Sequence, residues 1–186
     1  MRNISDKNKT ILSAIVLLVG LIWIWTSRVD AQSITQDHIA TPQIGFVAPD
    51  FSLKNQTDES VVLSEFMGNV ILINLWASWC LPCRKEMPIM QRVYQDYKDK
   101  GFIVFAVNVT NQDNRSDAIA FFEKNNLSFP LLFDDTGDVS NLYRLHSLPT
   151  TFFVGRDGII DDIVYGGPMS EALIRTKVEQ MLKDTP

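Results

Sequence analysis

Apolar residues along the chain fall into one N-terminal hydrophobic segment and a longer region of short apolar runs and amphipathic stretches. The run Val70–Trp76 is apolar except for Asn74, which is typical of a strand buried on both faces of a sheet. Phe102–Val109 predicts a second buried strand. Between these strands, residues 80–100 carry an apolar stripe at helical spacing, so we predict a helix that ends before Gly101.

Shorter elements are predicted on either side of this strand-helix-strand unit. They are a β-hairpin from Ala48–Lys54 and Val61–Leu63, a helix over 116–125 capped by Ser116, a strand at Pro130–Phe133, a helical turn at Val139–Leu145, a second hairpin from Thr150–Val154 and Ile159–Tyr165, and a last helix from Ser170 to Lys183. This order predicts an α/β fold with a central mixed sheet, helices on both faces and an N-terminal β-hairpin extension.

The N-terminal segment Ile11–Trp25 is almost entirely apolar. A helix over 10–27 spans roughly 27 Å, close to the roughly 30 Å hydrocarbon core of a bilayer. Basic residues mainly precede it, which favours a cytoplasmic N-terminus. We therefore expect a cytoplasmic tail at 1–9, a single transmembrane anchor at 10–27, a tether at 28–41 and an extracytoplasmic domain at 42–186. The alternative is a signal peptide cleaved near Ala31, which also exports the domain.

Composition and charge narrow the classes of function. The chain carries 17 Lys and Arg against 22 Asp and Glu, a net charge of −5. Four basic and two acidic residues lie within residues 1–36, which leaves a net charge of −7 for the rest of the chain. An acidic domain without a basic cluster is not expected to bind nucleic acid.

The two cysteines, Cys80 and Cys83, lie three positions apart. A structural disulfide stabilises mainly by closing a long loop, and this pair closes almost none. A zinc site needs about four ligands, and the other candidates, His38 and His146, are isolated and wrongly spaced. We therefore favour a redox-active dithiol, which needs no metal and no cofactor beyond the Cys80–Cys83 disulfide itself.

The position of the pair supports this choice. The strand Val70–Trp76 leads into the helix at Cys80, so the Cys80 sulfur faces unpaired backbone N–H groups and the positive end of the helix dipole. Both effects favour the thiolate and lower the pKa of Cys80. Cys83 lies nearly one helical turn further along and is expected to be less exposed.

The stretch around the cysteines reads Asn74-Leu75-Trp76-Ala77-Ser78-Trp79-Cys80-Leu81-Pro82-Cys83-Arg84-Lys85-Glu86-Met87-Pro88. It resembles the active-site stretch of thioredoxin-fold proteins. More closely, it is similar to that of the membrane-anchored TlpA/ResA-type thiol-disulfide oxidoreductases, which also resemble peroxiredoxins in general fold. A second signature, Leu148-Pro149-Thr150-Thr151-Phe152-Phe153-Val154 followed by Asp157-Gly158, resembles the cis-proline loop of that family. The resemblance covers roughly residues 42–183 and implies a thioredoxin-like fold.

The resemblance also implies where a substrate binds. Pro149 is expected to be cis and to pack across the dithiol, while Leu148 offers backbone groups to an extended substrate segment. Trp79, Leu81 and Pro82 are then expected to contact the substrate. Leu81 departs from the pattern of some close relatives in cytochrome c maturation, which have an acidic residue between the cysteines.

Two further residues bear on proton transfer. Asn74 departs from thioredoxin proper, which has a buried aspartate at this place that helps to move protons to and from the inner sulfur. Glu86 lies three residues after Cys83, on a neighbouring helical position. The TlpA/ResA-type group has a glutamate here, and the resemblance implies that Glu86 exchanges a proton with Cys83; taken alone, it is typical of a solvated helix surface. His146 is expected in an exposed loop, with a place lining the site as the alternative.

Together these features predict an extracytoplasmic thiol-disulfide oxidoreductase. We expect it to reduce disulfides in envelope proteins such as apocytochrome c, with electrons from a membrane thiol carrier. The alternative is an oxidase or isomerase that works in the opposite direction. A peroxiredoxin-like peroxidase would need a Pro-x-x-x-Thr/Ser-x-x-Cys setting, which neither cysteine has. A binding module on the same scaffold would not need two thiols.

Overall fold

The computed structural model describes residues 16–19, 23 and 40–183. The chain divides into two units, residues 1–37 and 38–186. Most of the expected anchor at 10–27 and most of the tether lie outside the described residues. Among the residues that are described, no helix is both long enough and apolar enough to cross a membrane.

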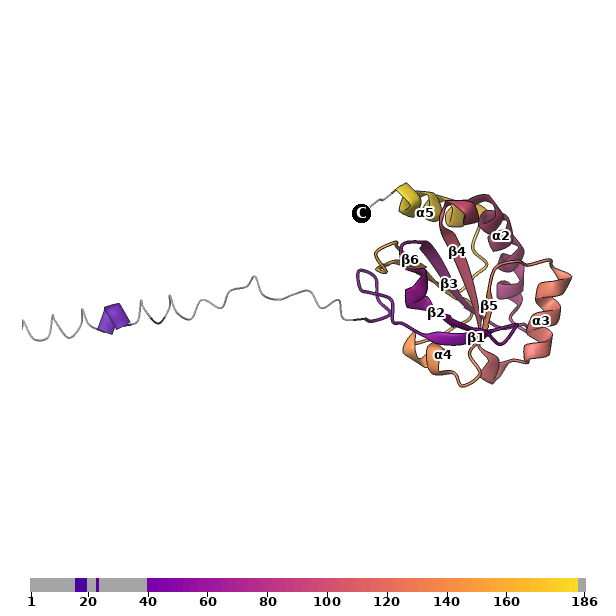
Figure 1. Cartoon of the computed structure of the whole chain (residues 1–186), viewed down its shortest axis with the longest axis horizontal. Helices are drawn as coiled ribbons and strands as arrows, with labels where there is room; N and C mark the ends of the chain where they lie inside the picture. The colour runs from indigo at the N-terminus through magenta and orange to yellow at the C-terminus, as the bar shows by residue number, and fades with distance from the viewer. Residues whose placement is uncertain (1–15, 20–22, 24–39, 184–186) are drawn as a thin grey trace, which may run out of the picture. The chain divides into compact units, whose positions relative to one another are not determined.

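The domain is built on a seven-stranded sheet with the strand order β2-β1-β5-β4-β3-β6-β7 (Figure 1). Its strands are β1 (Ser52–Asn55), β2 (Ser60–Val62), β3 (Val70–Trp76), β4 (Phe102–Asn108), β5 (Leu131–Phe133), β6 (Thr150–Val154) and β7 (Ile160–Tyr165). Strands β3, β4 and β5 are parallel, and β6 and β7 continue the sheet in antiparallel pairing. The β1–β2 hairpin pairs with β5 at the other edge. The predicted mixed sheet and its N-terminal hairpin extension are therefore confirmed.

Helices follow the strands in the expected order. They are α2 (Leu81–Tyr97), α3 (Arg115–Lys124), α4 (Asp138–Leu142) and α5 (Glu171–Lys183), with 3₁₀ turns η1 (Leu63–Phe66), η2 (Lys98–Lys100) and η3 (Thr110–Gln112). One cap differs from the prediction. Asn114 rather than Ser116 caps α3, because the Asn114 side-chain oxygen accepts hydrogen bonds from both the backbone N–H and the hydroxyl of Ser116.

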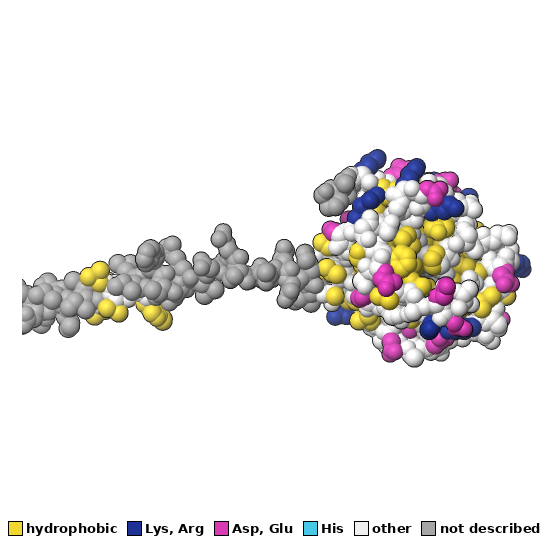
Figure 2. Space-filling model, in the orientation of Figure 1, with side chains coloured by type: hydrophobic (Ala, Val, Ile, Leu, Met, Phe, Trp, Pro, Cys, Tyr) yellow, Lys and Arg dark blue, Asp and Glu magenta, His cyan; other side chains and the backbone are white. Residues whose placement is uncertain are grey.

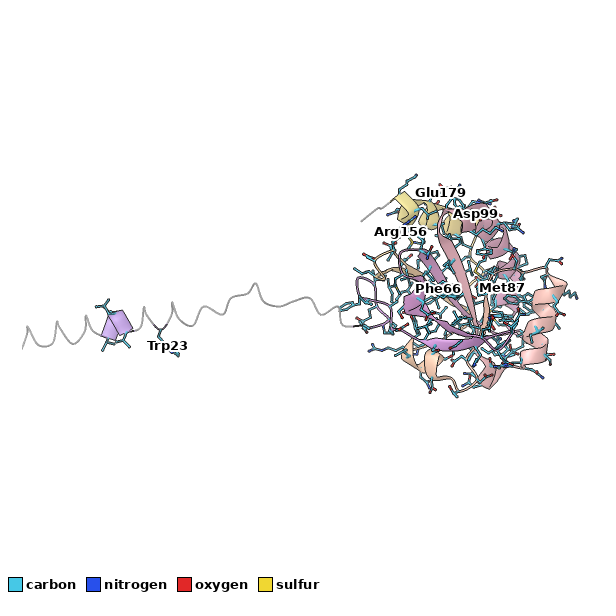
Figure 3. The ribbon with its side chains drawn as sticks, viewed as in Figure 1. Trp23, Phe66, Met87, Asp99, Arg156 and Glu179 are labelled. Carbon is cyan, nitrogen blue, oxygen red and sulfur yellow. A yellow bond between two sulfur atoms is a disulfide. The ribbon has the colours of Figure 1, made fainter. Side chains whose placement is uncertain are left out.

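Strand β3 is fully buried and distributes its side chains between two cores. Alternate residues of a strand point to opposite faces, so Leu72 and Trp76 face α2, α3 and α5, while Ile73 faces the side of η1 and α4. Met87 and Phe66, labelled in Figure 3, pack against these two different cores. This alternation places the Asn74 side chain on the same face as Trp76, beneath α2.

The surface of the domain carries charges of both signs. On the face seen in Figure 2, Lys and Arg side chains are interspersed with Asp and Glu, and apolar side chains occupy the centre. This agrees with the acidic, mixed charge pattern of the sequence.

Candidate active site

Cys80 and Cys83 form a disulfide at the start of α2, where β3 has just ended. Cys80 is the N-cap residue, so the helix begins one residue later than predicted, and its sulfur accepts a hydrogen bond from the Cys83 backbone N–H at 3.3 Å. Cys80 is 4% exposed and Cys83 is fully buried. The expected order of accessibility is therefore confirmed, with Cys80 as the outer sulfur.

The residues just before Cys80 are held by the segment that follows β4. The Asp113 carboxylate accepts hydrogen bonds from the backbone N–H and hydroxyl of Ser78 at 2.5 and 2.6 Å, and from the Asn108 amide at 2.7 Å. Burial opposes ionisation, but these hydrogen bonds outweigh it and lower the pKa of Asp113. The Trp79 indole N–H donates to the Gln112 carbonyl at 3.0 Å. Sequence reasoning missed both Asp113 and Gln112.

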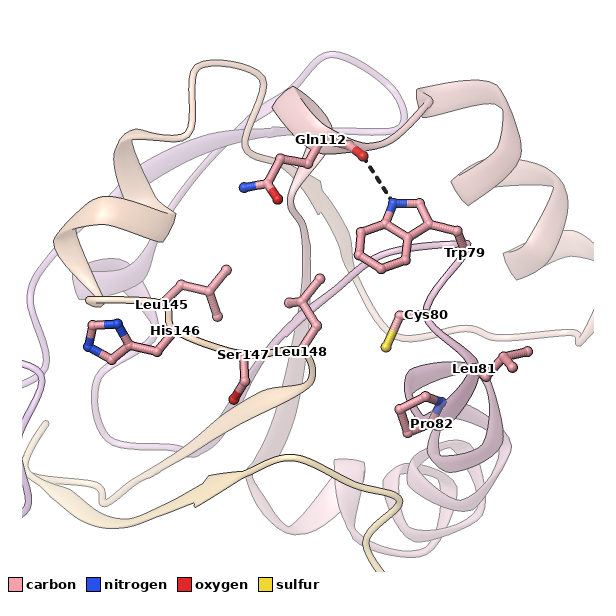
Figure 4. A pocket seen from close by; sticks show the side chains of 9 residues that line it. All are labelled: Trp79, Cys80, Leu81, Pro82, Gln112, Leu145, His146, Ser147 and Leu148. Carbon is pink, nitrogen blue, oxygen red and sulfur yellow. Dashed lines mark hydrogen bonds between the residues drawn. The ribbon is translucent and has the colours of Figure 1, made fainter.

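A pocket of about 530 Å³ opens beside Cys80 (Figure 4). It is lined by Trp79, Cys80, Leu81, Pro82, Gln112, Leu145, His146, Ser147 and Leu148. Trp79 and Leu81 are 57% and 67% exposed, although both are large apolar side chains. The structure therefore brings the four predicted substrate-contacting residues together on one surface. His146 is exposed and also lines the pocket, at the end away from Cys80.

The Leu148–Pro149 peptide bond is cis, as the family resemblance implied, and Pro149 is buried. The Pro149 carbonyl accepts a hydrogen bond from the Gly166 N–H at 2.7 Å, which fixes the loop against the end of β7. A second cis bond, Gly167–Pro168, lies in the loop between β7 and α5 and was not predicted.

Glu86 is fully buried, so the surface interpretation of this residue is wrong. Its Oε1 accepts a hydrogen bond from the Asn74 side-chain amide at 2.9 Å, and its Oε2 accepts one from the Met169 backbone N–H at 3.1 Å. The Asn74 amide also donates to the Thr151 hydroxyl oxygen at 2.9 Å, across the β3–β6 pair. Burial raises the pKa of Glu86 to about 7, against the effect of the Met169 and Asn74 hydrogen bonds.

This geometry suits proton-coupled thiol chemistry. An outer sulfur borders an apolar pocket, an inner sulfur is buried, and a carboxyl group with a pKa near neutrality lies one helical turn after the inner sulfur. Residues 44–163 match the AhpC/TSA family. The chain belongs to this family. It is 38% identical over 146 residues to the thiol-disulfide oxidoreductase ResA of Oceanobacillus iheyensis, covering 76% of this chain and 72% of that protein.

Two further similarities agree with this assignment. The chain is 38% identical over 141 residues to the thioredoxin-like protein YneN of Bacillus subtilis, covering 75% of this chain and 79% of that protein. A solved structure from Chlorobium tepidum, described as a candidate thiol:disulfide interchange protein DsbE, superposes with a TM-score of 0.70 at 34% identity. It covers 75% of this chain and 98% of its own. The protein is a thiol-disulfide oxidoreductase with a thioredoxin-like fold.

Proposed function

We propose that the protein reduces disulfides in other proteins, with Cys80 as the attacking thiolate and Cys83 as the resolving thiol. The observation that carries this proposal is the asymmetry of the pair. Cys80 borders an open apolar pocket, whereas Cys83 is buried on the same side of the sheet as the Glu86 carboxyl. A substrate disulfide therefore reaches Cys80 first.

The reaction takes place in two exchanges. The Cys80 thiolate attacks one sulfur of the substrate disulfide, a Cys80–substrate bond forms, and the other substrate sulfur leaves as a thiolate that takes a proton from solvent. The Cys83 thiol then loses its proton and attacks the Cys80 sulfur. The Cys80–Cys83 disulfide forms and the second substrate thiolate leaves, so two electrons have passed to the substrate.

Glu86 is the proposed proton acceptor for Cys83. A general base works best when its pKa lies near the working pH, and burial brings the pKa of Glu86 to about 7. Asn74 cannot take this part itself, because its amide is neither protonated nor deprotonated at neutral pH. It instead donates a hydrogen bond to the carboxylate that does.

Pro149 and the pocket residues are proposed to orient the substrate. The apolar surface around Cys80 suits an extended segment with apolar side chains next to its cysteine. The Leu148 backbone lies in the cis-proline loop, two residues before β6 begins, where it is placed to pair with such a segment. Trp79, Leu81 and Pro82 supply the opposite wall.

We further propose that the domain works outside the cell membrane, tethered by residues 10–27 with its N-terminus in the cytoplasm. The support is the apolar sequence at Ile11–Trp25 and the basic residues before it. In this compartment the oxidised pair needs two electrons from a membrane dithiol carrier to return to the working state. Envelope proteins with paired cysteines, such as apocytochrome c, are the proposed substrates.

Trapping experiments test this proposal. A Cys83→Ala protein, reduced and mixed with a disulfide-containing peptide, should accumulate a Cys80–peptide mixed disulfide that mass spectrometry detects. A Cys80→Ala protein should form none on the same time scale, because Cys83 is buried. An active Cys80→Ala protein would overturn the assignment of the attacking sulfur.

A further inference from the structure

The loop between β7 and α5, residues 166–170, contacts both Glu86 and the cis-proline loop. The Met169 N–H donates to Glu86 Oε2 at 3.1 Å, and the Gly166 N–H donates to the Pro149 carbonyl at 2.7 Å. Gly167 lies between these two anchored residues. The backbone there is therefore fixed from both sides, against two groups of the active site.

Gly167 has no room for a side chain. A Cβ atom at this position would lie 2.6 Å from Glu86 Oε2 and 2.8 Å from Pro149 Cγ, closer than any ordinary contact. The φ angle of Gly167 lies outside the left-handed region, so the backbone conformation itself does not require glycine. The need for glycine is steric, and it comes from the two active-site residues.

Neither neighbour can move freely to make room. Glu86 is fully buried, and its other oxygen is held by the Asn74 amide at 2.9 Å. Pro149 is buried, and its ring is closed onto its own backbone nitrogen, so it cannot rotate away as a free side chain could. A methyl group at Gly167 must therefore displace the carboxylate, the proline or the loop that carries the Met169 N–H.

We propose that Gly167 is a positioning residue for the resolving step: its lack of a side chain lets the β7–α5 loop close directly on Glu86 and Pro149. The loop thereby fixes the position of the Glu86 carboxyl, which accepts the Cys83 proton, relative to Pro149, which orients the substrate. This inference rests on the proposed function, because it assigns Gly167 a part through Glu86. If Gly167 had only a structural role, its replacement would lower stability and would not slow the resolving step more than the first attack.

The test compares Gly167→Ala with Gly155→Ala in the full chain. Gly155 is a matched control, since its Cβ would lie 2.8 Å from Asp157 Oδ1, also without a left-handed φ, but in the hairpin turn away from the site. The reduced proteins are mixed with a symmetric aromatic disulfide in a stopped-flow instrument. This probe releases one coloured thiolate at the Cys80 attack and the second at resolution.

Gly167→Ala should slow the second release by about tenfold or more, because small displacements of a catalytic group cost large factors in rate, and should leave the first release within about twofold. It should also move the pH inflection of the second release. Gly155→Ala should change neither. Equal second-release rates in Gly167→Ala and Gly155→Ala would overturn the inference.

A Glu86→Gln protein separates this inference from the proposed function. If Glu86→Gln resolves at the wild-type rate, the proton-acceptor role fails and the inference fails with it. If Glu86→Gln is slow while Gly167→Ala is not, only the inference fails. When Gly167 acts through Glu86, the Gly167→Ala change should add little in the Glu86→Gln background.

Thermal unfolding covers the case in which Gly167→Ala folds poorly. Truncation of Glu86 removes the atom nearest to the new Cβ. The fall in unfolding temperature caused by Gly167→Ala should therefore be smaller in the Glu86→Ala background than in the wild type. If Gly167→Ala lowers the unfolding temperature equally in both backgrounds, Glu86 is not the contact that requires glycine. This result would overturn the inference.

Discussion

The Asn74 side-chain amide donates a hydrogen bond to Glu86 Oε1 at 2.9 Å, which joins β3 to α2 beneath the Cys80–Cys83 disulfide. This bond favours the ionised carboxyl and opposes the effect of burial on its pKa. The readiness of Glu86 to accept a proton therefore depends on Asn74 as well as on burial.

Replacement of Asn74 by alanine should reduce the fraction of Glu86 that is ionised, and so able to accept a proton, at pH 7. Without the amide donor the pKa of Glu86 rises, so the pH inflection of the resolving step moves upward. At pH 7 the resolving rate should fall about tenfold or more, because a hydrogen bond to a charged group contributes about 1.5–3 kcal/mol. Stopped-flow measurement across pH 5.5–9 checks this.

Thr151→Val is the control, because it removes a second partner of Asn74 while it leaves the Asn74–Glu86 bond in place. Its pH inflection should stay close to that of the wild type. An Asn74→Ala protein with an unchanged inflection would show that the amide does not set the proton affinity of Glu86.

Glu86 should also make the stability of the oxidised protein depend on pH. Its pKa is about 7 in the fold against 4.5 in the unfolded chain, so the fold binds a proton that the unfolded chain has lost between these values. Stability is therefore full below about pH 4.5 and declines as the pH rises through 7, by about 3 kcal/mol in total. Urea unfolding of the wild type and of Glu86→Gln at pH 5 and pH 8 measures this, and parallel profiles would contradict it.

Leu81 should contribute to binding of protein substrates more than to the chemistry. It is 67% exposed and lines the pocket beside Cys80, so truncation removes apolar contact with a bound segment. Leu81→Ala should raise KM for a disulfide-containing peptide about three- to tenfold and leave the rate with a small disulfide unchanged. Ile44→Ala removes a 57% exposed side chain that does not line this pocket and should leave both unchanged. A KM equal to that of the wild type would exclude Leu81 from the binding surface.

Asp113 should hold the segment before Cys80 in place. Its carboxylate accepts three hydrogen bonds from Ser78 and Asn108, and hydrogen bonds to charged groups are stronger than neutral ones. Asp113→Ala should lower the free energy of unfolding by about 2 kcal/mol. Asp113→Asn, which keeps one acceptor oxygen, should lose less. Equal stability of Asp113→Ala and the wild type in urea would show that these hydrogen bonds do not anchor the segment.

The sequence was sufficient for the central fold and the redox pair, because both have local signatures. The apolar run Val70–Trp76 matches β3, and the helix after it begins at the cysteine pair. The interruption at Asn74 was visible in the pattern, but its partners were not. Its side-chain N–H groups donate to Glu86 and Thr151, while its Oδ1 is buried with no hydrogen-bond partner among the described residues.

Other parts of the site had no local signature. The burial of Glu86 involves the β7–α5 loop, residues 166–170, which is about eighty residues away in the sequence. Asp113 and Gln112 reach Ser78 and Trp79 only because parallel strands β3 and β4 end at the same edge of the sheet. The steric need for glycine at 167 comes from side chains of two other elements, so no property of the loop sequence reveals it.

The reduction potential of the Cys80/Cys83 couple tests most directly whether the protein is a reductant. It can be measured by equilibrating the full chain in dithiothreitol buffers of set ratio and quantifying the free thiols by alkylation. If the protein is a reductant, the value should lie near that of thioredoxin, about −270 mV, so that the dithiol passes electrons to protein disulfides. A value near about −120 mV, in the range of strong oxidants, would contradict it and make the protein a donor of disulfides.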